Sequence, residues 1–290
     1  MTTTLRKTLR KLPFGDVYRY LRELLIYLRL PTKTPYGFKF IGIKKMVSGG
    51  FEPDVAAFII EEVKRGARTF IDVGAHHGFF TILASHYGLV TYSFEPDPLN
   101  YRVLKRNVRV SHSKTSKIHN IGLSNFTDKL TFFGFATGVS RNSNWAGSNS
   151  KRKFVVEVSP LDKSLSLENL QEPILVKVDV EGYESEVIEG AIGVFENHRD
   201  ITIICEITFS EKQINGESHS IKALKMSQSL VAQGFEIFTI ALDGSLQPTS
   251  ISELVRINER NELGVSANFV FKRNARGFNS TSKESKSYES

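Results

Sequence analysis

Short apolar runs alternate with longer amphipathic segments through the middle of this chain. The runs cover residues 69–73, 90–95, 117–121, 174–180 and 201–206, and each has the length of a buried strand. Helical patterns precede and separate most of these runs, and Asp54 and Asp97 are expected to cap two of the predicted helices. This alternation predicts an α/β fold with a mostly parallel sheet and helices on both faces. Two later runs, residues 235–240 and 268–272, bring the predicted strand number to seven.

The alternation breaks after the third predicted strand. Residues 129–135 and 153–158 alternate apolar and polar positions, which is typical of antiparallel strands. They predict a β-hairpin insertion, joined by residues 138–150, which are rich in Ser, Asn and Gly and contain the only tryptophan, Trp145. A polar connection of this length is typical of a lid, a substrate loop or disorder.

The two ends of the chain differ from this middle part. Residues 5–30 have a helical pattern broken near Pro13, with leucines crowded between arginines. Such a segment is either a helix packed on the edge of the domain or a basic amphipathic helix on an anionic membrane surface. We expect a basic N-terminal extension and linker over residues 1–33, one domain over residues 34–272, and a disordered tail over residues 273–290.

The basic charge is concentrated at the ends. The formal net charge is +7, with seven basic and two acidic residues in 1–30 and five basic and two acidic residues in 272–290, so the body is close to neutral. A near-neutral body does not predict a nucleic-acid groove. The single cysteine, Cys205, cannot pair within the chain. A reducing, cytoplasmic location is therefore expected, with peripheral membrane contact as the alternative. The oligomeric state stays open.

One loop carries most of the chemical information. Asp72 lies at the end of the first apolar run, just before a turn between Gly74 and Gly78, and Glu95 ends the second strand about twenty residues later. This arrangement predicts a site for an adenosine-bearing ligand, with the second carboxylate on the ribose hydroxyls. The glycines lie four apart with His76 and His77 between them, unlike the Gly-x-Gly-x-x-Gly loop of dinucleotide sites. S-adenosylmethionine is thus favoured over the cofactor of a nucleotide-dependent oxidoreductase.

The motifs also resemble a known family, the FkbM family of S-adenosylmethionine-dependent methyltransferases. The resemblance covers about residues 34–272, and its most specific part is Lys177-Val-Asp-Val-Glu-Gly-Tyr-Glu184. The other matching segments are Thr34-Pro-Tyr-Gly-Phe-Lys-Phe40, Gly50-Phe-Glu-Pro53, Asp72-Val-Gly-Ala-His-His-Gly78, Phe94-Glu-Pro-Asp-Pro98 with Asn100 and Asn107, Asn120-Ile-Gly122, Leu161-Asp162, Cys205-Glu206 and Gly234-Phe235. It implies a class I, Rossmann-like methyltransferase fold. It also implies methyl transfer to a hydroxyl of a small molecule or glycan acceptor, with a sugar in a glycan, glycolipid or natural product as the expected acceptor.

The cofactor residues follow from the loop together with the resemblance. Asp72 is expected to fix the loop and meet the methionine ammonium, and Glu95 to accept hydrogen bonds from both ribose hydroxyls. The remaining expected contacts are Gly74, Ala75, His76 and Gly78 in the loop, Pro96 after the second strand, and Asn120 and Ile121, where class I methyltransferases contact adenine.

Three carboxylates are candidates for the catalytic step. Asp179 and Glu181 end the fourth predicted strand and Glu206 ends the fifth, so all three are expected at the ligand-binding edge of the sheet. Alternation along the fourth strand is expected to place Asp179 and Glu181 on the same side. One of them would remove the proton of an acceptor hydroxyl. Alternatively, Asp179 supports the cofactor and Glu181 caps the next helix. His119 is another candidate base, and a Mg²⁺ site is a minority interpretation because no ligand spacing singles it out.

The chain departs from the family pattern within the glycine loop. His76 stands where the family usually has Asn, and His77 where it usually has an aliphatic residue. These two side chains leave open the hypothesis of a non-catalytic adapter with a degenerate methyltransferase fold.

Overall fold

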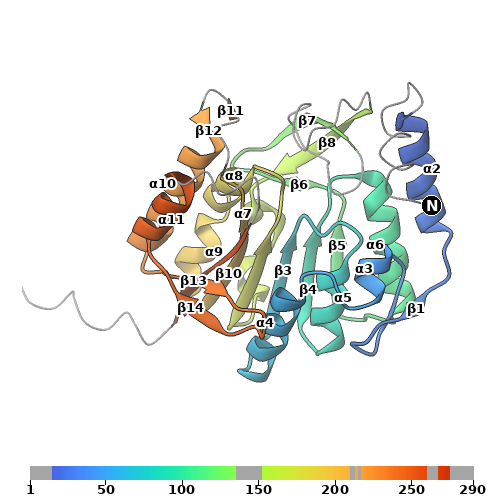
Figure 1. The fold of residues 1–290 in the computed structure, drawn as a ribbon, viewed down its shortest axis with the longest axis horizontal. Coiled ribbons are helices and arrows are strands. Elements are labelled where there is room, and N and C mark those ends of the chain that lie inside the picture. The colour runs from blue at the N-terminus through green and yellow to red at the C-terminus, as the bar shows by residue number, and fades with distance from the viewer. Residues whose placement is uncertain (1–14, 135–151, 210–212, 215–216, 260–266, 275–290) are drawn as a thin grey trace, which may run out of the picture.

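The fold is organised around one large sheet. The computed structural model describes residues 15–134, 152–209, 213–214, 217–259 and 267–274. Within them, eight strands form a sheet in the order β14-β13-β15-β10-β9-β3-β4-β5 (Figure 1). Their bounds are β3 Thr69–Val73, β4 Val90–Phe94, β5 Ser116–His119, β9 Ile174–Val178, β10 Ile201–Ile207, β13 Glu236–Ile240, β14 Leu246–Pro248 and β15 Ala267–Arg273.

The strand directions agree with the prediction, but the strand number was wrong. Strands β10, β9, β3, β4 and β5 are parallel neighbours, and β15 runs antiparallel between β10 and β13. The eighth strand, β14, lies antiparallel to β13 at the edge of the sheet. It was missed because it has three residues and ends in Pro248, and proline within a run argues against a central strand but is tolerated at a sheet edge.

The helices cover both faces of the sheet, since neighbouring strand residues point to opposite sides. On one face, Phe70 and Leu175 pack with side chains of α4 and α5, while on the other Ile71 and Val176 pack with α8, α9 and α10. The helices are α3 Lys44–Val47, α4 Pro53–Lys64, α5 Phe79–His86, α6 Pro98–Val110, α7 Leu161–Ser164, α8 Glu184–Glu189, α9 Ile192–Asn197, α10 His219–Ala232 and α11 Ile251–Glu259.

A smaller sheet lies over the carboxyl ends of the parallel strands. It contains β6 Gly122–Leu123, β7 Asp128–Phe133 and β8 Lys153–Ser159, with β7 antiparallel and β6 parallel to β8. The predicted hairpin therefore gains a third, two-residue strand. Its connection, including Trp145, lies outside the described residues.

The N-terminal segment packs against the body of the protein. Helix α2 (Gly15–Tyr27) lies beside α6 at the edge of the molecule (Figure 1). The segment expected to be a linker forms β1 (Thr32–Lys33), which pairs with β2 (Lys39–Phe40). No helix in the described part of the chain is long and apolar enough to cross a bilayer. The expected domain boundaries stay a prediction, and the residues after 274 lie outside the described part.

Two local expectations were wrong. The strand predicted over residues 174–180 ends at Val178, so alternation along a strand does not place Asp179 and Glu181 on one side. Helix α4 begins after Glu52, which has a left-handed φ of 40°, so Asp54 lies inside the first turn and is not the cap. By contrast, the prediction that Asp97 caps the helix at Pro98 is confirmed, because its Oδ1 accepts from the Leu99 amide at 2.8 Å.

Candidate functional site

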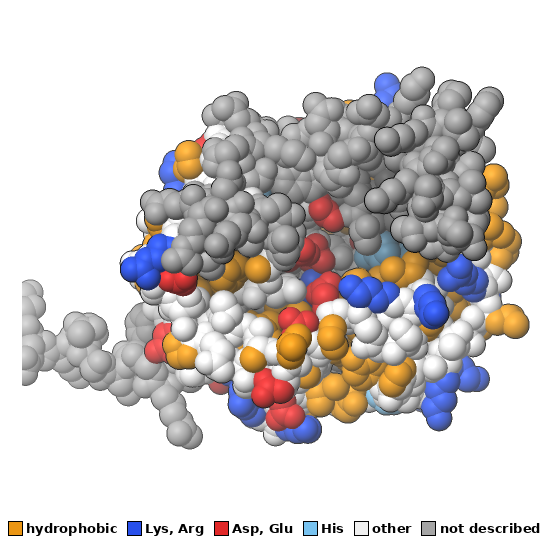
Figure 2. Space-filling model, viewed as in Figure 1, with side chains coloured by type: hydrophobic (Ala, Val, Ile, Leu, Met, Phe, Trp, Pro, Cys, Tyr) orange, Lys and Arg blue, Asp and Glu red, His pale blue; other side chains and the backbone are white. Residues whose placement is uncertain are grey.

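A pocket opens where the loops after β3, β4 and β9 meet the small sheet. It encloses about 820 Å³ of empty space, part of it open to solvent. Its lining residues are Phe51, Gly74, His76, Glu95, Pro96, Asn100, Gly122, Leu123, Ser124, Leu130, Phe132, Val158, Asp179, Val180, Glu181 and Tyr183. Figure 2 shows acidic side chains gathered in the middle of this face of the molecule.

The glycine loop passes very close to the loop after β9. Gly74 has φ +83°, and a Cβ on it would lie 1.8 Å from the carbonyl oxygen of Asp179. The amides of Gly74 and Ala75 both donate to the Phe94 carbonyl at 3.0 Å. Only glycine fits this conformation and this spacing, so the backbone itself forms the floor of the pocket.

Gly78 has a different role from Gly74. It precedes α5 with φ +83°, and a Cβ on it would lie 2.3 Å from Cδ1 of Leu104 on α6. Gly78 and Ala75 do not line the pocket, and Ala75 is buried. These two predicted cofactor residues shape the loop from beneath.

Asp72 lies behind the loop and does not line the pocket. It is buried, and its Oδ2 accepts from the Thr81 hydroxyl at 2.6 Å, which in turn contacts the Ser93 hydroxyl at 2.8 Å. Burial raises the pKa of Asp72 to about 6, although the Thr81 hydrogen bond and Lys177 lower it. In this structure, Asp72 ties β3 to α5.

Glu95 reaches the pocket and is held by three donors. Its Oε2 accepts from the His76 amide at 2.7 Å, and its Oε1 accepts from the Asp97 amide at 2.9 Å and from Asn100 Nδ2 at 3.3 Å. Burial raises its pKa to about 8, helped by the charge of Asp97 and opposed by these donors. A carboxylate has about four acceptor positions, so Glu95 can accept a further hydrogen bond from the pocket.

Asn120 fixes the turn after Glu95 without reaching the pocket. Its amide donates to the carbonyl oxygens of Glu95 at 2.7 Å and Pro96 at 3.1 Å. Pro96 lines the pocket, whereas Asn120 and Ile121 lie outside the lining and Gly122, Leu123 and Ser124 lie within it. The chain therefore enters the pocket one residue later than the predicted pair.

The two histidines of the loop stack on each other. Their ring centroids are 3.8 Å apart, and His76 has a left-handed φ of 50°. Both ring nitrogens of His76 are buried with no hydrogen-bond partner among the described residues. Burial lowers the pKa of His76 well below its usual range, as do the neighbouring His77 and Arg22, so the ring is neutral.

His77 connects the loop to the N-terminal helix. It is buried, and its Nε2 lies 3.5 Å from Oε2 of Glu23 on α2, which is buried as well. Burial raises the pKa of Glu23, but the neighbouring His77 and Arg22 lower it further, so the net shift is downward. A segment expected to lie outside the domain thus supports the glycine loop.

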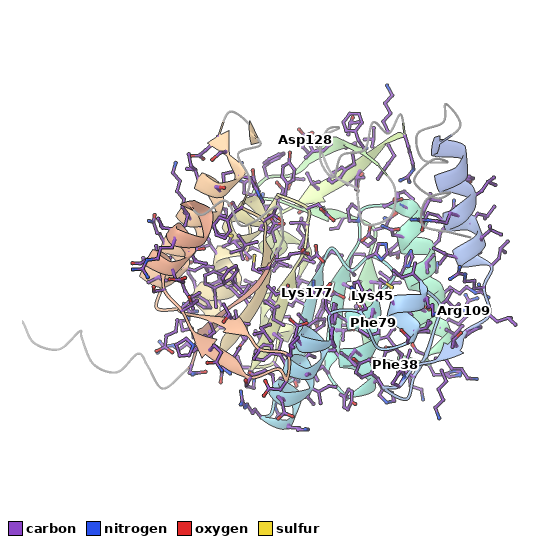
Figure 3. All side chains as sticks on the ribbon, in the orientation of Figure 1. Phe38, Lys45, Phe79, Arg109, Asp128 and Lys177 are labelled. Carbon is purple, nitrogen blue, oxygen red and sulfur yellow. The ribbon has the colours of Figure 1, made fainter. Side chains whose placement is uncertain are left out.

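A buried lysine on β9 lies between the carboxylates of Asp179 and Glu52. Lys177 Nζ lies 3.1 Å from Oδ2 of Asp179 and 3.7 Å from Oε2 of Glu52, and Figure 3 shows it near the middle of the sheet. Burial lowers the pKa of Lys177, but Asp179 and Glu52 raise it further, so it stays charged. Asp179 keeps a lowered pKa because Lys177 outweighs the effect of burial.

Glu206 stands behind Asp179. It does not line the pocket, and burial together with the charge of Asp179 raises its pKa. The pKa values of Asp179 and Glu206 thus shift in opposite directions, so we assign the negative charge of this pair to Asp179 and the proton to Glu206.

The loop between β9 and α8 presents Glu181 to the pocket. Glu181 has φ 52° and Gly182 has φ 101°, which turns the chain sharply. Glu184 holds this turn by accepting from the Gly182 amide at 3.0 Å, and its Oε2 lies 3.2 Å from Nε2 of the buried His219. His219 was given no role from the sequence, since only the fold brings α10 to this loop.

The small sheet supplies an apolar wall that sequence reasoning missed. Leu130 and Phe132 on β7 and Val158 on β8 line the pocket. The sequence did contain a signal for this wall, because Leu130 and Phe132 are two residues apart in the predicted hairpin and therefore lie on one face of it. Arg152 anchors this wall through a bidentate ion pair with Asp97, at 2.6 and 2.7 Å.

Two further candidates are not supported by the geometry. His119 stacks on Phe94 with ring centroids 4.9 Å apart and does not line the pocket. Across the described ranges, no group of three or more His, Cys, Asp or Glu side chains is placed to hold a metal ion.

The fold defines a class of protein, an α/β protein with a mostly parallel, doubly wound sheet. The Methyltransferase FkbM domain matches residues 72–237, which is more than half of the chain. The chain therefore belongs to the FkbM family of S-adenosylmethionine-dependent methyltransferases. This membership favours methyl transfer over the oxidoreductase alternative.

The solved structures that match this chain share little sequence with it. An O-methyltransferase from Bacillus cereus in complex with S-adenosylhomocysteine is 11% identical over 94% of this chain and 97% of that chain, with a TM-score of 0.47. A precorrin-6y C5,15-methyltransferase from Geobacter metallireducens is 12% identical over 81% and 95%, with a TM-score of 0.40. EvdMO1 is 15% identical over 90% of this chain with a TM-score of 0.43, and the chain spans about half (48%) of its length. No curated protein matches the sequence.

Proposed function

We propose that this protein transfers the methyl group of S-adenosylmethionine to a hydroxyl, with Asp179 as the residue that orients the hydroxyl and accepts its proton. The observation that supports this proposal is that Glu95 and Asp179 line one pocket on either side of the Gly74 backbone. Glu95 suits a ribose, and Asp179 suits a group that approaches the methyl.

The pocket residues fit the cofactor. Gly74 lines the pocket with backbone alone, so a ligand can lie directly against the loop. Glu95 is a buried carboxylate with acceptor capacity remaining. When bound, S-adenosylmethionine supplies a methyl group on a sulfonium, which needs no further activation to leave.

Asp179 has the charge state that the reaction requires. Lys177 and a protonated Glu206 keep it ionised. The C–O bond forms as the S–C bond breaks, and the hydroxyl proton becomes strongly acidic as its oxygen is methylated. An ionised carboxylate of low pKa can therefore take this proton at Oδ1 or Oδ2, and Lys177 and Glu206 hold that carboxylate in place.

A sugar hydroxyl is the acceptor that we favour. Phe132, Leu130 and Tyr183 offer apolar contact, while Asp179 and Glu181 offer hydrogen-bond acceptors in the same pocket. A sugar has an apolar ring face and a rim of hydroxyls, so it can use both kinds of contact. The resemblance to FkbM methyltransferases points to the same class of acceptor.

The test is transfer of labelled methyl from S-adenosylmethionine to a panel of glycans and glycolipids. Asp179→Asn preserves the shape of the side chain but is a far weaker proton acceptor, so the rate should fall by about 10²–10⁴-fold while S-adenosylhomocysteine affinity changes little. Glu157→Gln, at an exposed carboxylate on β8, is the matched control. An undiminished rate in Asp179→Asn, or a methylated nitrogen or sulfur in the product, would contradict the proposal.

A further inference from the structure

Helix α2 exposes an unusual concentration of apolar side chains. Of the fourteen large hydrophobic side chains exposed among the described residues, seven lie between residues 20 and 30. Leu25 and Leu28 are each 62% exposed, and Leu30 is 83% exposed. The other four are Tyr20, Leu21, Leu24 and Tyr27. Single exposed leucines are ordinary, but a contiguous group marks an interaction surface.

This apolar face cannot turn inward, because the opposite face of α2 is already in contact with the protein. Ile26 and Glu23 are buried, and Glu23 meets His77. The Arg106 guanidinium donates to the Tyr27 carbonyl oxygen and lies over the Tyr27 ring, and Arg29 Nη1 donates to the Gly42 carbonyl oxygen at 2.9 Å. The body of the protein thus holds the helix with its leucines pointing to solvent.

Basic side chains border the apolar face. Helix α6, which packs beside α2, carries Arg102, Lys105, Arg106 and Arg109 and no acidic residue. Arg102, Lys105 and Arg109 are exposed, and Figure 3 shows Arg109 beside the N-terminal segment. In Figure 2, apolar and basic side chains occur together along the right-hand edge of the molecule. The one acidic side chain described on α2, Glu23, is buried.

We infer that the face formed by α2 and α6 binds the surface of an anionic lipid membrane. Exposed leucines and tyrosines next to lysines and arginines match a bilayer interface, where apolar side chains enter the acyl boundary and cations meet lipid phosphates. No described helix could span the bilayer, so the contact is peripheral. The charge complementarity favours an anionic membrane over a second copy of this chain, whose matching face would carry the same basic residues.

The test is co-sedimentation of the full chain with vesicles of phosphatidylcholine alone and of phosphatidylcholine mixed with phosphatidylserine. The wild type should bind the mixed vesicles, and should bind at least about tenfold more weakly to the neutral vesicles or at high salt. Leu25→Glu with Leu28→Glu should lower binding by at least about tenfold. Leu242→Glu is the matched control, because Leu242 is 88% exposed but lies at the turn between β13 and β14.

A second pair of variants tests the basic border. Arg109→Glu should weaken binding to the mixed vesicles. Lys163→Glu, which reverses the charge of an exposed lysine on α7, should not. Far-ultraviolet circular dichroism of each variant confirms that it is folded. Two results would overturn the inference: no sedimentation of the wild type with the mixed vesicles, or binding that neither the leucine nor the arginine substitutions reduce. A concentration-dependent dimer that Leu25→Glu with Leu28→Glu abolishes, without vesicle binding, would instead identify a second copy as the occupant.

Discussion

The charge on Glu95 makes cofactor binding sensitive to pH. Its pKa is raised to about 8 in the unliganded protein, and the ionised carboxylate is the form that accepts hydrogen bonds from two ribose hydroxyls. Above pH 8 the carboxylate is already ionised, so the affinity should be constant. Below pH 8 a proton must leave before the ligand binds, so the affinity should fall about tenfold for each pH unit.

The hydrogen bonds that Glu95 accepts also determine how much its substitution should weaken ligand binding. Hydrogen bonds to a charged group contribute about 1.5–3 kcal/mol each, so two of them are worth roughly 3–6 kcal/mol. Glu95→Gln should therefore weaken S-adenosylhomocysteine binding by about 10²–10⁴-fold at pH 8.5. The variant should also lose the pH dependence between pH 6 and pH 8, because Gln does not titrate.

Calorimetric titration of S-adenosylhomocysteine at several pH values measures both effects. Glu236→Gln, an exposed residue at the start of β13, is the matched control and should behave as the wild type. A wild-type affinity that does not change from pH 6 to pH 9 would refute the reasoning. A pH dependence that persists unchanged in Glu95→Gln would refute it as well, since another group would then be titrating.

Three further predictions concern the loop and the buried lysine. Gly74→Ala should abolish measurable S-adenosylhomocysteine binding, because its Cβ meets backbone at 1.8 Å, whereas Gly88→Ala, with φ +98° and open space, should bind normally and lose about 1–2 kcal/mol of stability. His76 has a lowered pKa in the folded protein, so its contribution to the free energy of unfolding is present above pH 6.5 and is lost as the pH falls. Between pH 7.5 and pH 5.5, the free energy of unfolding measured in urea should fall by about 1.4 kcal/mol more for the wild type than for His76→Asn. Equal falls for the two proteins would contradict this. Lys177→Met should cost about 3–5 kcal/mol because it leaves buried carboxylates unpaired, whereas Lys64→Met, at a lysine side chain 65% exposed, should cost under about 1 kcal/mol.

The central part of the fold could be predicted because it is encoded locally. Strands such as Thr69–Val73 and Ile201–Ile207 are short apolar runs that are buried along nearly their whole length, and a parallel sheet produces this pattern. Gly74 and Glu95 could be named because a close backbone approach and a carboxylate at a strand end have a fixed spacing along the chain. Asp97 was identified as a helix cap for the same reason.

The parts that could not be predicted depend on contacts between distant segments. The Glu23–His77 contact joins residues on separate elements, and neither residue carries a local signal for it. Asp72 looked like a cofactor ligand, but Thr81 and Ser93 draw its carboxylate into the interior. The apolar wall of the pocket comes from a hairpin whose position over the site depends on Arg152 reaching Asp97.

A crystal structure of the protein with S-adenosylhomocysteine is the most direct test of the site. We expect the ribose hydroxyls within hydrogen-bond distance of Glu95, the ligand backbone against Gly74, and the sulfur facing the side of the pocket formed by Asp179 and Glu181. A ligand bound elsewhere, or one whose ribose does not meet Glu95, would contradict the proposed site. A protein that takes up no ligand at all, because the ring of His76 fills the pocket, would favour the adapter hypothesis over methyl transfer.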